Sequence, residues 1–243
     1  MKVRGSLEAN LKAASEGVQE AGRQEPAFIA LPEYFSVPNS MEQFTSASKI
    51  SKETYQSTIN FLSAVSREFS KSYISGGTVL EEHCGEFFNT STLWKNGVLI
   101  AKYRKKNPIS VEMKAGVSGG SEPVVVKTEC CKVGLLVCAD MFDPVIVKQT
   151  VDLGAELIFL PVAAMGTHPR VTGHPLTERI SSENGVFLVK IGNVGSSLRG
   201  GRSAIIAPWG VLEEVSDVPE DSLVTMDLDL KRLRQYRRKL SKT

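Results

Sequence analysis

The chain alternates between two hydrophobic patterns, one typical of amphipathic helices and one typical of buried strands. Apolar residues recur every three to four positions over 7–21 and again over about 51–69, and both stretches therefore predict helices. Shorter, nearly continuous apolar runs predict strands at 27–31, 73–80, 87–94, 98–103, 124–127, 132–138, 157–161, 186–191, 203–207 and 223–228. Capping residues and apolar spacing predict further helices at 144–153, 176–184 and about 230–240.

Three of the predicted strands, 133–137, 157–160 and 186–189, are almost entirely apolar, which is typical of strands covered on both faces. Helices and strands alternate along the chain, so the pattern predicts an α/β fold with one mixed sheet or with two sheets packed against each other. No linker, repeat or low-complexity tract divides the sequence. We therefore expect residues 1–243 to form a single domain.

Composition narrows the class of protein. The 243 residues are 42% hydrophobic and carry 29 basic and 27 acidic side chains, which excludes a disordered chain and gives no bulk attraction to nucleic acid. The longest apolar runs have about five residues, whereas a membrane span needs roughly 20, and the first residues show no apolar leader. Four cysteines in such a chain predict a reduced, cytoplasmic protein. The basic residues at 230–240 are interleaved with leucines, which favours a docked helix with a solvated basic face over a nucleic-acid handle.

Cys138 is the first candidate for chemistry. It ends a buried strand and precedes the start of a helix, a position where α/β proteins place their sites and where the helix N-terminus favours a thiolate. A free cysteine is also commonly buried without any role. The three histidines, His83, His168 and His174, lie in predicted loops without the context of a Cys–His pair or a metal site. We therefore predict neither a metal nor a cofactor.

Glu33 and Lys105 also follow predicted strands. Taken singly, Glu33 is explained by a salt bridge at the end of a strand, and Lys105 is explained as part of a basic turn. Together with Cys138 they supply an acid, an amine and a sulfur nucleophile, each at the end of a strand, which is the set that covalent catalysis of acyl transfer needs.

On these residues the chain resembles the nitrilase, or carbon–nitrogen hydrolase, superfamily along nearly its whole length. The resemblance depends on the segments around Glu33, Lys105 and Cys138, which are 31–35, 103–105 and 133–142. It is supported by shorter matches at 154–156, 183–187, 200–203 and 208–210. The order of these segments is more specific than any one of them.

The resemblance implies a four-layer αββα sandwich with two mixed sheets, which pairs into a homodimer or a larger homo-oligomer. It also implies a cofactor-free hydrolase that cleaves the C–N bond of a small linear amide through a thioester on Cys138. Glu33 would act as base, Lys105 would stabilise the oxyanion, and Glu112 would be a second glutamate that positions the lysine and the substrate. The residues that it places around the substrate are Tyr34, Ala139, Met141, Phe142, Ala163 and Ala164.

Three features depart from the family's pattern. Only Met1 to Gly5 are available for a first strand before the first predicted helix, so that strand is short or missing. Asn107 and Pro108 follow the lysine segment where His-Leu is common, which leaves Lys106 as an alternative to Lys105. The residues 161–164 lack the polar or aromatic side chains common after that strand, which leaves the specificity of the pocket open.

Other functions remain as alternatives. A catalytically idle member of the same fold would bind a ligand or a partner, and a nitrile hydrolase would use the same three residues. The stretch Gly116–Gly120 matches the G-x-S-x-G pattern of serine hydrolases, but that motif needs a strand before it and a helix after it, and the sequence here continues into a strand.

Overall fold

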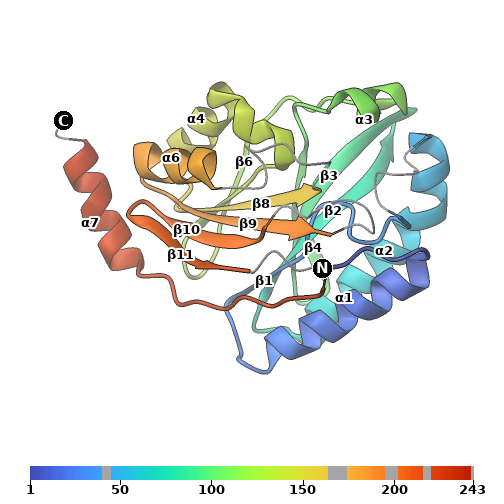
Figure 1. The fold of residues 1–243 in the computed structure, drawn as a ribbon, viewed down its shortest axis with the longest axis horizontal. Coiled ribbons are helices and arrows are strands. Elements are labelled where there is room, and N and C mark those ends of the chain that lie inside the picture. Colours follow the sequence, from blue (N-terminus) through green and yellow to red (C-terminus); the bar gives the residue numbers. More distant parts are fainter. Residues whose placement is uncertain (40–44, 164–173, 195–201, 216–219, 242–243) are drawn as a thin grey trace.

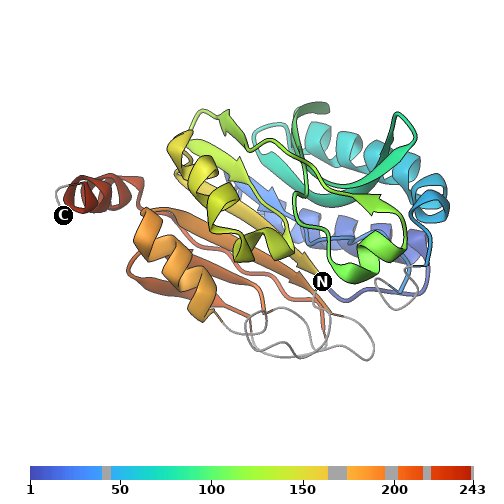
Figure 2. The ribbon, with the colours of Figure 1, turned by 90° about the horizontal axis from the view of Figure 1, so that it is seen from above.

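The computed structural model describes residues 1–39, 45–163, 174–194, 202–215 and 220–241 (Figure 1). Two mixed sheets pack face to face and helices cover their outer sides (Figure 2). This is the αββα arrangement that the resemblance implied, and the prediction of the fold class is confirmed.

The first sheet has the strand order β1-β2-β3-β4, and the short β5 pairs with β3. Its strands are β1 (Phe28–Ala30), β2 (Tyr73–His83), β3 (Glu86–Lys95), β4 (Val98–Arg104) and β5 (Val117–Ser118). The helices α1 (Leu7–Gly22) and α2 (Ala47–Glu68) pack on this sheet. Ser6 and Ser46 cap the first turns of these helices, because each hydroxyl accepts a hydrogen bond from a first-turn N–H.

The second sheet has the order β11-β10-β9-β8-β7-β6. Its strands are β6 (Val124–Lys127), β7 (Lys132–Leu135), β8 (Leu157–Ala163), β9 (Phe187–Asn193), β10 (Ala204–Ala207) and β11 (Gly210–Glu214). The helices α4 (Pro144–Asp152) and α6 (Pro175–Asn184) pack on it. Because β7, β8 and β9 run parallel, their carboxyl ends open on the same edge of the sheet, where β7 leads to Cys138.

The main core lies between the two sheets. Phe28 and Tyr73 of the first sheet stack with their ring centroids 5.4 Å apart, and Phe28 meets Phe159 of the second sheet at 5.7 Å. A second apolar cluster, which includes Leu62 and Ile74, lies beneath α1 and α2. Among the described residues no helix is both long enough and apolar enough to cross a membrane.

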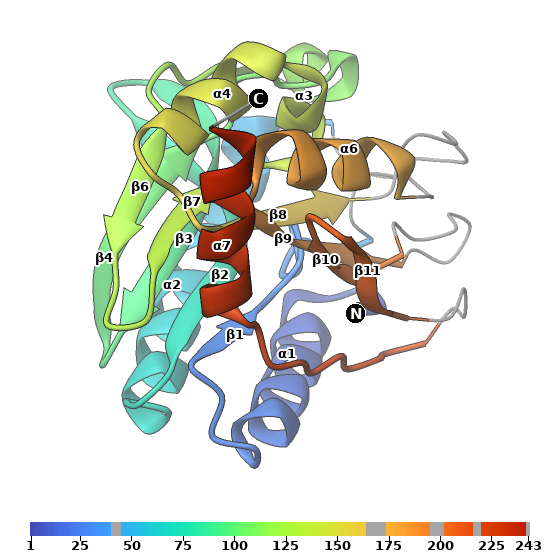
Figure 3. The same ribbon diagram turned by 90° about the vertical axis from the view of Figure 1, so that its left-hand side faces the viewer.

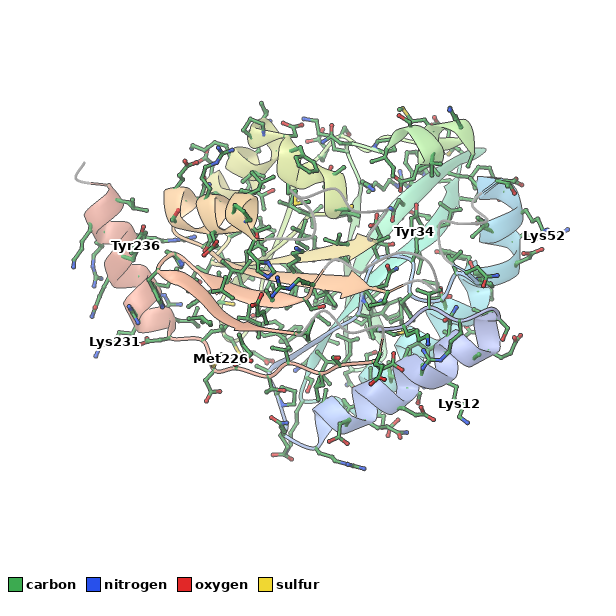
Figure 4. All side chains as sticks on the ribbon, in the orientation of Figure 1. Lys12, Tyr34, Lys52, Met226, Lys231 and Tyr236 are labelled. Carbon is green, nitrogen blue, oxygen red and sulfur yellow. The ribbon has the colours of Figure 1, made fainter. Side chains whose placement is uncertain are left out.

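The predicted strand at 223–228 is wrong. Residues 221–229 contain no strand, and both Leu223 and Met226 are more than two-fifths exposed. The side chain of Met226 points away from the body of the protein (Figure 4). A strand needs a neighbour to share its backbone hydrogen bonds, and the described residues before α1 supply only an isolated bridge between Lys2 and Val194.

Other boundaries also differ from the prediction. The strand expected to reach Cys138 ends at Leu135, and Cys138 begins the 3₁₀ turn η2 (Cys138–Phe142). Helix α3 (Ser110–Lys114) and the strands β5 and β11 were not predicted. The serine of the G-x-S-x-G stretch lies in β5, and no helix follows it before β6, so the context of a serine nucleophile is absent there.

The basic C-terminal helix α7 (Leu230–Leu240) docks as expected (Figure 3). Leu233 is fully buried, and the guanidinium of Arg237 donates hydrogen bonds to the backbone oxygens of Gly185 and Ala155. Arg234 forms an ion pair with Glu156 at 2.7 Å. Part of the basic charge therefore attaches the helix to the body of the protein.

Candidate active site

Lys105 lies at the centre of a buried polar cluster. It directly follows β4, and its side chain is only 1% exposed. Its Nζ donates hydrogen bonds to Glu33 Oε1 at 3.0 Å and to Glu112 Oε2 at 2.8 Å. A buried ammonium needs such partners, because an unpaired charge away from water is strongly unfavourable.

Glu33 follows β1 on a loop that rests on β2. Gly77 of β2 has a φ of +56°, and a Cβ at this position would lie 2.0 Å from the carbonyl oxygen of Pro32. Only glycine therefore allows the loop to approach so closely. The Glu33 carboxylate also accepts a hydrogen bond from the backbone N–H of Ala163 at the end of β8, and the backbone oxygen of Glu33 accepts one from Asn193 at 2.7 Å.

Glu112 lies in the short helix α3 and is fully buried. Its Oε1 accepts a hydrogen bond from the hydroxyl of Tyr34 at 2.7 Å, and its Oε2 accepts one from the backbone N–H of Ile109 at 2.8 Å. Tyr34 has a φ of +51° and its side chain lies inside the molecule (Figure 4). These bonds fix the carboxylate that holds Lys105.

Asn89 connects the two carboxylates, although the sequence analysis did not select it. It lies in β3, and its Nδ2 donates to Glu33 Oε1 and to Glu112 Oε1, both at 2.7 Å. Its signal in the sequence is a polar residue within a strand whose residues 88–94 are all buried. Such a residue needs a buried polar partner, and here it has two.

Cys138 begins the turn η2 with a φ of +43°, a left-handed conformation that non-glycine residues seldom adopt outside functional sites. Its side chain is buried and the thiol interacts with the Glu33 carboxylate. Burial, followed by the charge of Glu33, raises the pKa of the thiol. The protonated thiol is therefore favoured over the thiolate in this environment.

Asp140 holds the turn in place. Its Oδ2 accepts hydrogen bonds from Tyr103 Oη at 2.8 Å and from the backbone N–H of Val137 at 3.0 Å. Its Oδ1 accepts from the backbone N–H and the side chain of Asn107, at 3.0 and 3.1 Å. One carboxylate therefore connects the turn that begins at Cys138 to the segment that carries Lys105.

The charges of the cluster are unequal. Burial raises the pKa of Glu33, and the charge of Glu112 adds to this effect against the opposing charge of Lys105. Burial also disfavours the charge of Glu112, but Lys105 and the hydrogen bonds from Ile109 and Tyr34 lower its pKa overall. Burial disfavours the ammonium of Lys105, but the neighbouring anions raise its pKa above the ordinary value. The pKa values of the two glutamates are thus shifted in opposite directions, and Glu112 forms the ion pair with Lys105 in its ionised form.

The structure separates the two candidate lysines. Lys106 points away from the cluster, is about 30% exposed and lies 3.5 Å from Asp143. Lys105 contacts both glutamates.

The residues predicted around the substrate have different positions. Tyr34 and Ala163 contact the two glutamates, as described above. Ala139 is half-buried in η2, Met141 is buried in the main core and Phe142 is 42% exposed. Ala164 lies outside the described residues.

The described histidines and the cysteines are spread over several parts of the fold. His83 is exposed, His174 pairs with Glu214, and His168 lies outside the described residues. Cys84, Cys130, Cys131 and Cys138 are all free thiols. Within the described part of the chain no three His, Cys, Asp or Glu side chains are grouped to hold a metal ion.

Comparison with known proteins places the chain in a family. The family model described as carbon-nitrogen hydrolase matches residues 2–238. The chain belongs to the carbon–nitrogen hydrolase family. Among curated carbon–nitrogen hydrolases it is similar to human omega-amidase NIT2, with 28% identity over 246 residues that cover 95% of this chain and 87% of the human protein.

Solved carbon–nitrogen hydrolases share the fold. Nit3 of Saccharomyces cerevisiae, a member of branch 10 of the nitrilase superfamily, superposes with a TM-score of 0.84 at 25% identity and covers 98% of this chain and 91% of its own. An amidase from Nesterenkonia sp. superposes with a TM-score of 0.83 at 24% identity, over 100% of this chain and 92% of its own. The second likeness supports the fold alone.

Proposed function

We propose that this carbon–nitrogen hydrolase cleaves the C–N bond of small linear amides, with Cys138 as nucleophile and Glu33 as general base. The observation that carries the proposal is the buried ammonium of Lys105, which is bonded to both Glu33 and Glu112 beside the thiol of Cys138. A protein that only binds a ligand has no need of such a cluster. Burying the charges of Lys105, Glu33 and Glu112 is unfavourable, and such clusters are typical of functional sites. The similarity to omega-amidases supports amides as the substrate class.

The first half of the reaction forms a thioester. The Glu33 carboxylate takes the proton of the Cys138 thiol, and Sγ attacks the carbonyl carbon of the amide. The ammonium of Lys105 and the backbone N–H of Ala139 stabilise the negative oxygen of the tetrahedral intermediate. When this intermediate collapses, the C–N bond breaks, Glu33 returns the proton to the leaving nitrogen, and ammonia departs.

The second half regenerates the enzyme. Glu33, again a carboxylate, accepts a proton from a water molecule whose oxygen attacks the thioester carbon. The same two donors stabilise the second oxyanion, the C–S bond breaks, the carboxylic acid leaves, and Glu33 returns its proton to the thiolate of Cys138. Glu112 does not exchange protons in this scheme, because it stays ionised and keeps the ammonium of Lys105 directed toward Glu33.

Ammonia release from a panel of amides and nitriles tests this function. We expect the wild-type protein to release ammonia from short primary amides such as butyramide and succinamic acid, and the Cys138→Ala variant to release none above background. Cys84→Ala is the matched control, because Cys84 is an exposed free thiol. Full activity in Cys138→Ala would exclude the proposed nucleophile. Inactivity of the wild type on the whole panel, with four equally reactive cysteines, would favour the binding protein.

A further inference from the structure

A second group of ionisable side chains lies on strands β9 to β11 of the second sheet, the sheet whose strand β7 leads to Cys138. Lys190 of β9 is 1% exposed although it carries an amine. Near it are Arg202, Glu214 and His174, all of which interact electrostatically with one another or with Lys190. We call Lys190, Arg202, Glu214 and His174 the β9–β11 ionic cluster.

The strand register brings this cluster together. Ala204 of β10 pairs with Lys190 of β9 on one side and with Glu214 of β11 on the other, and both pairings are antiparallel. Directly paired residues project from the same face of a sheet, so Lys190 and Glu214 flank Ala204 on one face. The small methyl group of Ala204 leaves the space above it to the two longer side chains.

Glu214 holds two further members of the cluster. Its Oε1 lies 2.8 Å from an Arg202 nitrogen, and its Oε2 lies 2.8 Å from Nε2 of His174. His174 is the N-cap of α6 and is only 7% exposed. One carboxylate therefore serves an arginine and a histidine close to a buried lysine, and the start of α6 adds further positive potential.

Cys138 lies on the side of Lys190 opposite to Glu214. Lys190 pairs with Leu160 of β8, and Phe159 of β8 pairs with Leu135 of β7, the strand that leads to Cys138. Strand β9, which carries Lys190, is thus two strands away from β7, which leads to Cys138, and the two backbones are about 10 Å apart. The long side chain of Lys190 can bring its amine closer to Cys138 than this backbone distance. Strand β8 and helix α6, which both contact β9, also contact the turn η2 that begins at Cys138.

The charges in this region support an electrostatic interaction between Lys190 and Cys138. Burial lowers the pKa of Lys190 to about 8, and the charge of Arg202 adds to that effect. The negative charges of the Cys138 thiolate and of Glu214 act in the opposite direction and raise the pKa of Lys190. The interaction is reciprocal, so an ammonium at Lys190 makes the thiolate of Cys138 more favourable.

We propose that Lys190 is a positioning residue of the active site, a second buried ammonium that favours the thiolate of Cys138 through the protein interior. The inference rests on the proposed function only in taking Cys138 as the nucleophile. Among the described residues, the charged and titratable groups that interact with Lys190 include Arg202, Glu214, His174 and Cys138. The ammonium acts below pH 8 and its support fades as Lys190 loses its proton above that pH.

The test is the rate at which iodoacetamide alkylates Cys138 between pH 5 and pH 10, followed by mass spectrometry of the peptide that carries Cys138. We expect the profile of Lys190→Met to move to higher pH, so that alkylation at neutral pH slows by about tenfold, the effect of one unit in the thiol pKa. Lys127→Met is the matched control, an exposed lysine on strand β6 of the same sheet, and its profile should equal that of the wild type.

The variant Lys190→Arg provides a second test in case Lys190→Met does not fold. Arginine does not titrate in this range, so this variant should be alkylated at least as fast as the wild type below pH 8 and faster above it. Identical profiles for the wild type and the folded Lys190 variants would overturn the inference. If the wild type releases no ammonia from the amide panel while the Lys190→Met profile still shifts, the proposed function fails and the inference stands, so the two failures are distinguishable.

Discussion

Lys105 and Glu112 are seven residues apart in the sequence and form an ion pair of 2.8 Å in which both side chains are almost completely buried. Such a pair adds little net stability, but removing one partner leaves an uncompensated charge in the interior. The pair is also directional, because Tyr34 and Ile109 fix the carboxylate from two other sides. The ammonium is consequently held where it can face both Glu33 and a developing oxyanion.

Replacing either candidate lysine by methionine separates their roles. We expect Lys105→Met to lower kcat by between about a hundredfold and a thousandfold, the usual cost of one oxyanion donor. Lys106→Met should retain nearly full activity, because Lys106 pairs with Asp143 outside the cluster. Steady-state kinetics on the best amide of the panel decides, and equal losses in the two variants would contradict the assignment.

The pH dependence of kcat/KM reports on Glu33. Because burial raises the pKa of Glu33, the acid limb of the profile should lie above the ordinary value of a glutamate. The charge of Glu112 contributes to this rise, so Glu112→Gln should lower the pKa of Glu33 and move the acid limb to lower pH while kcat falls. Glu122→Gln, at an exposed loop position, is the control. An acid limb that stays in place in Glu112→Gln would show that another group controls it.

Asp140→Asn should weaken the fold around the nucleophile. Each oxygen of this carboxylate accepts two hydrogen bonds. An asparagine would replace one oxygen by an NH₂ group, which would face two donors instead of accepting from them. We expect the free energy of unfolding to fall by about 2–3 kcal/mol, measured by urea denaturation. Asp152→Asn, which alters an exposed pair with Lys148, should change it by less than about 0.5 kcal/mol. Similar values for the two variants would contradict the role of Asp140.

Glu81 should stabilise the protein in a pH-dependent way. Burial opposes its charge, but Arg104, Lys102 and Thr90 lower its pKa to about 2. A pKa that is lower in the folded state gives stability that is complete above the ordinary value of about 4.3 and disappears as the pH falls toward 2. Glu81→Gln should thus cost about 2 kcal/mol at pH 7 and progressively less at pH 4 and pH 3. The exposed neighbour Glu82 gives the control variant Glu82→Gln, and a cost that does not shrink with pH would refute the argument.

The main elements of the fold follow from local patterns. The apolar runs at β7, β8 and β9 and the capped helices α1 and α4 are strong local signals, and the resemblance supplied the pairing of the two sheets. The segment 223–228 has the composition of a strand, but strand formation depends on a partner that no local pattern reveals. Helix α3 has five residues and was too short to show a period.

The site was predictable only in part for a similar reason. Glu33, Lys105, Glu112 and Cys138 were identified through the order of short motifs, and the structure brings them together. Asn89 and Asp140 were missed, because their importance comes from hydrogen bonds to residues distant in the sequence. Lys190 was also missed, since a lysine within an apolar strand gives no sign of what lies two strands away.

The most direct test of the account is to find the acyl group on Cys138. A reaction with a good amide substrate is quenched in acid during the steady state, and the protein is digested and analysed by tandem mass spectrometry. We expect a mass increase equal to one acyl group on the peptide that carries Cys138, and none in Cys138→Ala. Steady ammonia release with an unmodified Cys138, or with the acyl group on another residue, would contradict the thioester mechanism.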